Sequence, residues 1–159
     1  IRDEQGLAYD VDSGFEANVM PGRFSVTLQT RNAAANQAIA AALVEIKRIR
    51  TEPVSDQELA DAKRSMIASF ALSLESPAQL LSLYVTQWRY KLAADYWDRY
   101  PDRVSAVTRE QILAAARKYL AANHLQIVAV GDPAKVGDTL KKLGAVETYD
   151  TEGKRIGSR

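Results

Sequence analysis

The chain has 159 residues, 47% of them hydrophobic and 26% charged, which is typical of one globular domain with a sizeable core. Its 21 Lys and Arg residues balance 20 Asp and Glu residues, so the formal net charge is +1. This balance argues against a nucleic-acid partner, and the absence of cysteine excludes disulfides, thiolate metal sites and cysteine nucleophiles.

The chain opens with a polar segment followed by an alternating one. Residues 1–5 end at Gly6, a pattern typical of a last helical turn closed by a glycine. Residues 7–12 alternate with period two and place Leu7, Tyr9 and Val11 on one face of a strand. Because the first residues resemble the end of a helix whose start is missing, we expect a piece of a longer protein. The small number of predicted strands for a domain of this size also indicates missing strands upstream.

A hairpin and several helices are predicted next. Phe24, Val26 and Leu28 alternate with polar residues, which indicates a half-buried strand that pairs with the first strand. The period then becomes helical until Pro53. Three further helices are predicted from their start signals, which are Ser55 with Glu58, Ser76 with Gln79, and Thr108 with Gln111.

The last part of the chain predicts a return to strands. Residues 125–130 form an apolar run, interrupted only by Gln126, that ends at Gly131-Asp132, which indicates a strand covered on both faces. Residues 134–143 predict a short helix and residues 146–149 a closing strand, whereas the polar tail of residues 151–159 is expected to be frayed. The fold class is therefore α+β, an antiparallel sheet with helices packed on it, in one domain over residues 1–150.

Motifs for catalysis are scarce. His124 is the only histidine, neither H-E-x-x-H nor H-x-x-E-H occurs, and we expect no catalytic zinc in this chain. Phosphate loops and a serine-nucleophile elbow are also absent from the sequence, and no apolar run approaches the ~20 residues of a membrane span. Six aromatic residues either line a groove or, as is typical at helical spacing, form core: Tyr84, Trp88, Tyr90, Tyr96, Trp97 and Tyr100.

One succession of residues is more specific. Arg2 is followed by a polar stretch, Gly6-Leu7, and Tyr9 seven residues after the arginine. Further on, Asp95-Tyr96 and Tyr100 precede Val107-Thr108, and the apolar run that ends at Gly131-Asp132 follows. From residue 1 to about 150, this order resembles the second-half domain of insulinase/pitrilysin-type zinc metallopeptidases, the inverzincins that include mitochondrial-processing-peptidase-like proteins.

The resemblance implies half of an enzyme. In this family two similar α+β domains or subunits enclose a peptide-binding chamber, and the first half carries zinc on an H-x-x-E-H motif. The second half has lost the motif and supplies an arginine and a tyrosine, which are Arg2 and Tyr9 by position here. The resemblance therefore implies that Arg2 binds substrate, that Tyr9 stabilises the oxyanion, and that the chain alone hydrolyses nothing.

The resemblance leaves other interpretations open. Tyr9 could be a core tyrosine, and Arg2 could only favour the helix dipole. The domain could also be a catalytically inactive scaffold, or a half that captures peptides at a sheet edge. The size class of the resembling bacterial proteins predicts a periplasmic location, with the cytoplasm as the alternative.

Overall fold

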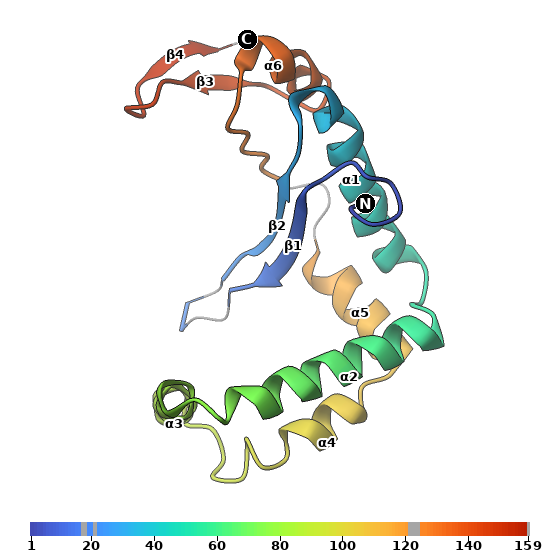
Figure 1. Ribbon diagram of the computed structural model, residues 1–159, viewed down its shortest axis with the longest axis vertical. Coiled ribbons are helices and arrows are strands. Elements are labelled where there is room, and N and C mark those ends of the chain that lie inside the picture. The colour runs from blue at the N-terminus through green and yellow to red at the C-terminus, as the bar shows by residue number, and fades with distance from the viewer. Residues whose placement is uncertain (17–18, 21, 121–124, 159) are drawn as a thin grey trace. The chain divides into compact units, whose positions relative to one another are not determined.

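The protein has an α+β fold, as the sequence predicts, with small antiparallel sheets and a larger helical part (Figure 1). The computed structural model describes residues 1–16, 19–20, 22–120 and 125–158. The chain forms two compact units, one of residues 1–47 with 121–159 and one of residues 48–120.

The first unit contains two hairpins. Its elements are β1 (Asp10–Phe15), β2 (Phe24–Gln29), the 3-10 helix η1 (Asn32–Ala34), most of α1 (Ala35–Thr51), α6 (Pro133–Lys141), β3 (Glu147–Tyr149) and β4 (Arg155–Ser158). The second unit is helical. Its elements are α2 (Asp56–Ser73), α3 (Pro77–Tyr90), α4 (Tyr100–Ser105) and α5 (Arg109–Tyr119).

The predicted hairpin of the first two strands is confirmed. β1 and β2 pair antiparallel, with Val11 opposite Leu28 and Phe15 opposite Phe24. The rings of Phe15 and Phe24 lie 4.8 Å apart, a cross-strand aromatic contact of the kind that stabilises paired strands. The first strand begins later than predicted, at Asp10, but the Tyr9 N–H still donates to the Gln29 carbonyl at 2.7 Å.

Alanine residues of α1 form part of the core. Ala38 is 0% exposed, and Ala35 and Ala42 are each 8% exposed. The isoleucine and leucine residues of this helix are only half-buried, namely Ile39, Leu43, Ile46 and Ile49. Small side chains allow close approach of neighbouring backbone, so the most tightly packed face of the helix is the alanine face.

All three predicted helix starts are present. Ser55 and Thr108 form complete capping boxes with Glu58 and Gln111, and the Ser76 hydroxyl accepts from the Gln79 N–H. A capping residue satisfies backbone donors that would otherwise lack partners.

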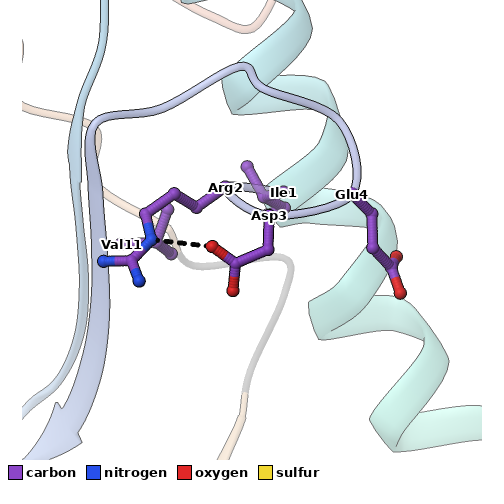
Figure 2. A pocket seen from close by; sticks show the side chains of 5 residues that line it. All are labelled: Ile1, Arg2, Asp3, Glu4 and Val11. Carbon is purple, nitrogen blue, oxygen red and sulfur yellow. Dashed lines mark hydrogen bonds and ion pairs between the residues drawn. The ribbon is translucent and has the colours of Figure 1, made fainter.

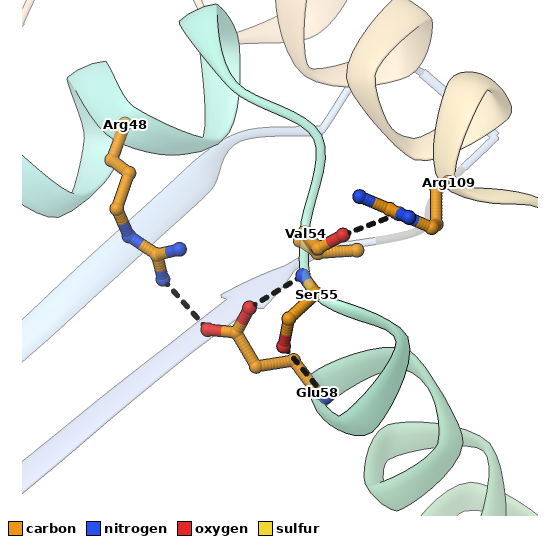
Figure 3. A network of polar contacts seen from close by, with 5 residues as sticks. All are labelled: Arg48, Val54, Ser55, Glu58 and Arg109. Carbon is orange, nitrogen blue, oxygen red and sulfur yellow. Dashed lines mark hydrogen bonds and ion pairs between the residues drawn. The ribbon is translucent and has the colours of Figure 1, made fainter.

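Additional contacts reinforce the start of α2 (Figure 3). Arg48 donates to Glu58 at 2.9 Å, and Arg109 Nε donates to the Val54 carbonyl at 2.6 Å. Within the second unit, these contacts tie the end of α1 and the beginning of α5 to the first turn of α2.

Two predictions for the late segment are wrong. Residues 125–130 belong to no strand, and Val128 and Val130 are 89% and 101% exposed. An extended segment becomes a strand only when a neighbour accepts and donates its backbone hydrogen bonds, and in the described part of the chain the sheets contain only β1 with β2 and β3 with β4.

The tail is not frayed at Arg155–Ser158, because these residues pair with β3 as β4. Asp150 orders the intervening turn by accepting from the N–H groups of Glu152 and Lys154, and Arg155 forms an ion pair with Glu147 at 3.1 Å.

No single helix among the described residues is long and apolar enough to span a membrane. Only α2 and α3 together meet such a criterion of length and composition, and they are bent by 107° at their junction.

Candidate functional site

A hydrogen-bonded turn fixes the backbone around Arg2. The Gly6 N–H donates to the Arg2 carbonyl at 2.9 Å, and the Leu7 N–H donates to the Ile1 carbonyl at 3.2 Å. Gly6 has a φ of +60°, a left-handed conformation that glycine adopts without steric cost. The bond from the Gly6 N–H to the Arg2 carbonyl and the left-handed Gly6 are those of an αL turn, and they confirm the predicted turn closed by Gly6.

Arg2 lies at the surface with an acidic neighbour. Its Nε donates to Oδ1 of Asp3 at 3.0 Å, and the Arg2 side chain is 58% exposed. The hydrogen bond and the charge of Asp3 raise the pKa of Arg2 above its ordinary value, with a smaller contribution from the charge of Asp10. Arg2 is therefore a fully charged group that a solvent-borne ligand can reach.

A recess of about 490 Å³ adjoins Arg2 (Figure 2). It is lined by Ile1, Arg2, Asp3, Glu4 and Val11, and the side chain of Arg2 extends beside Val11 of β1. The side chains of this surface, one guanidinium and two carboxylates, have a summed formal charge of −1. Such a surface favours a neutral acceptor, for example a peptide carbonyl, over a free anion.

Tyr9 lies just before β1 and is 84% exposed. The interpretation of Tyr9 as a core residue is therefore wrong for this chain. Its backbone is held by the hydrogen bond to Gln29, whereas its ring is free to contact a ligand. Tyr9 is not among the residues that line the recess beside Arg2, so the structure does not bring the two predicted site residues together in one pocket.

The described residues offer no ligand set for a metal. No group of three or more His, Cys, Asp or Glu residues among them is arranged to hold an ion. His124, the only histidine of the sequence, lies outside the described residues. Zinc therefore does not fit the described part of this chain.

Of the six aromatic residues singled out in the sequence, Tyr90 is half-buried at the end of α3, and the other five divide into two groups. Tyr96, Trp97 and Tyr100 pack together with Phe70 of α2, and Arg103 lies 4.4 Å from the ring centre of Tyr96. This group is structural, and Phe70 is a member that the helical period alone did not connect to the others.

Tyr84 and Trp88 of α3 behave differently. They are 68% and 83% exposed, so they belong to no core among the described residues.

Two comparisons with known proteins agree on the family. The family model described as the peptidase M16 inactive domain matches residues 1–66, which include Arg2 and Tyr9. A solved structure, the peptidase M16 inactive domain from Pseudomonas fluorescens, is similar to 76% of this chain at 28% sequence identity and a TM-score of 0.68. The resemblance to the insulinase/pitrilysin (M16) family is confirmed. None of the curated proteins compared matches the chain.

The M16 resemblance has definite limits along the chain. The M16 family model ends within α2, so it does not extend to the late apolar segment and Gly131-Asp132. The chain spans 29% of the length of the M16 structure that it matches. The inactive M16 domain is thus supported, and the activity of a complete protein is a matter for proposal.

Proposed function

We propose that this chain is the zinc-free second half of an M16 peptidase and assists peptide cleavage at a zinc site carried by another half. The observation that carries the proposal is the exposed ring of Tyr9 on a hydrogen-bonded backbone, within the region matched by the M16 inactive domain. The partner is an N-terminal half or a separate subunit with the H-x-x-E-H motif.

Tyr9 is proposed to stabilise the oxyanion. During peptide hydrolysis negative charge develops on the carbonyl oxygen, and a fixed phenol O–H is a suitable donor for that oxygen. Loss of one such donor typically lowers kcat by about 10²–10³. The exposure of Tyr9 supports this role, because its ring is not packed in the core and can contact a substrate without any rearrangement of the core.

Arg2 is proposed to bind the peptide main chain. Its planar group of donors suits a carbonyl or a carboxylate, and its backbone is fixed by the turn at Gly6. Because Asp3 and Glu4 share the recess, a neutral carbonyl is the better partner for Arg2 than an anionic side chain.

Zinc would supply the activated water and a Lewis acid in the complete enzyme. The described residues of this chain contain no set of ligands for it. Their proposed contribution is therefore to bind and orient the peptide and to donate to the developing oxyanion.

A second candidate function is capture of peptides by strand addition. Residues 125–130 are apolar and exposed and pair with no strand among the described residues. An extended peptide could add beside such a segment through main-chain hydrogen bonds. Peptide binding without any cleavage by the complete protein would favour this function, or that of a scaffold.

The proposal is tested by peptide cleavage with three samples: this chain, the complete protein that contains it, and an Arg2→Ala variant of the complete protein. Bound zinc is quantified in each sample. The proposal predicts no cleavage by the chain, cleavage by the complete protein, and a loss of activity without loss of zinc in the variant. A complete protein that binds no zinc and cleaves no peptide would refute it.

A further inference from the structure

One side of α3 already contacts other residues of the second unit. Leu83, Thr86, Gln87 and Tyr90 are the half-buried positions of the helix near its C-terminal end. The Gln87 side-chain amide donates to the carbonyls of Ala93 and Ala94, at 2.9 and 3.1 Å. Trp97 Nε1 donates to the Leu83 carbonyl at 3.1 Å. The segment that follows α3 thus holds this side of the helix in place.

The opposite side of α3 is apolar and exposed. Leu81, Tyr84, Val85 and Trp88 are 64%, 68%, 44% and 83% exposed, and we refer to these four residues as the α3 stripe. Their spacing of three and four residues places them on one face of a helix. The more apolar face of α3 is therefore the exposed one, which is the reverse of a surface helix in a monomer.

The composition and size of the α3 stripe suit a protein interface. Tryptophan and tyrosine are enriched at the energetic centres of interfaces, where charged residues are depleted. At the exposures of Trp88 and Tyr84, the two rings alone leave on the order of 300 Å² uncovered.

A stable interface buries about 800 Å² on each partner. Leu72, Leu74 and Leu80, near the α2–α3 junction, are also 66%, 40% and 36% exposed, so the second unit exposes more apolar area than the stripe alone.

The charges at the two ends of α3 indicate the occupant. Arg89 is the only charged residue within α3 and lies in its last turn, whereas Glu75 lies just before the N-cap Ser76. Two antiparallel copies of α3 would bring Glu75 of each toward Arg89 of the other, while two parallel copies would bring like charges together. The stripe between these residues has no charge that would repel an identical stripe.

We propose that the α3 stripe is a homodimer interface, in which two copies of this chain pair their α3 helices antiparallel about a two-fold axis. The same patch serves both copies, as the symmetry of such a dimer requires. The interface is independent of Arg2 and Tyr9, so this proposal goes beyond the proposed function and stands or fails separately from it.

The first test is sedimentation velocity of the 159-residue chain over a range of micromolar concentrations. The proposal predicts a concentration-dependent dimer, and a Trp88→Gln substitution should weaken association at least about tenfold. Tyr119→Gln is the matched control, because Tyr119 is a 60% exposed aromatic of the same unit outside α3. Circular dichroism verifies that both variants are folded.

A charge exchange tests the antiparallel arrangement. Glu75→Arg and Arg89→Glu should each weaken the dimer, and the double variant should restore it, because the exchanged pair is again complementary. A chain that stays monomeric at every concentration, or a dimer that Trp88→Gln leaves unchanged, would overturn the proposal. If the double variant does not regain the dimer, the antiparallel arrangement is wrong, and the stated interface is overturned with it.

Discussion

Arg2 and Asp3, adjacent in the sequence, are also bonded through their side chains, with Nε of Arg2 donating to Oδ1 of Asp3 at 3.0 Å. The side chains are 58% and 84% exposed, and solvent screens an ion pair so exposed, so that it contributes little to stability. A substrate that binds Arg2 can therefore displace Asp3. The pair orients Arg2 without blocking it.

Replacing Asp3 should change how the complete enzyme binds peptides. Asp3→Asn removes the competing carboxylate and one negative charge from the recess, so a peptide with a free carboxylate should bind up to about fivefold more tightly. A matched peptide amide should change less. The measurement is KM for the two peptides, with Asp12→Asn as the control, since Asp12 is exposed on β1 and does not line the recess. Identical effects of the two substitutions would contradict this assignment of Asp3.

Glu58 should make stability depend on acidic pH. The N–H of Ser55 and the side chains of Arg48 and Ser55 lower the pKa of Glu58 from 4.5 to about 2 in the folded chain. A lowered folded-state pKa means that the stabilisation is present above pH 4.5 and is lost as the pH falls toward 2.

A Glu58→Gln variant should accordingly have a lower free energy of unfolding than the parent at pH 7, and the difference should shrink toward zero near pH 2. Denaturant titrations between these values measure it. The carboxylate is 47% exposed, so solvent screening reduces the size of the difference. A difference that is constant over this pH range would exclude the network around Glu58 as its origin.

The alanine face of α1 should not tolerate larger side chains. Ala38 is 0% exposed, so Ala38→Leu forces additional methyl groups into a filled space and should lower the free energy of unfolding by about 1–3 kcal/mol. Ala40→Leu is the control on the same helix, because Ala40 is exposed and a change there should stay within about 0.5 kcal/mol. Equal losses in thermal or denaturant unfolding would show that Ala38 is not in a packed core.

The parts of the fold that could be predicted depend on residues close together in the sequence. Ser55 with Glu58 and Thr108 with Gln111 satisfy backbone donors within one helical turn, so the pattern contains the whole interaction. The hairpin of β1 and β2 was predictable for a similar reason, since its two strands, Asp10–Phe15 and Phe24–Gln29, lie close together in the sequence.

Features that depend on distant partners were not predictable in this way. The apolar run at residues 125–130 resembles a buried strand, but strand formation requires a neighbour that the pattern does not contain. Conversely, Arg155–Ser158 has little strand character and forms β4 because the turn at Asp150 and the ion pair with Glu147 bring it beside β3. The exposure of Tyr9 could likewise not be predicted, because period-two alternation identifies one face of a strand but not whether other residues cover that face.

The most direct test of the proposed function is kcat/KM of the complete enzyme with Tyr9→Phe, measured beside Tyr119→Phe as an exposed tyrosine outside the matched region. Tyr9→Phe should lower kcat/KM by about 10²–10³ while bound zinc stays the same and the free energy of unfolding changes by less than about 0.5 kcal/mol. Tyr119→Phe should leave all three unchanged. A Tyr9→Phe enzyme that retains the activity of the parent would contradict the account, because the phenol O–H would then take no part in the reaction.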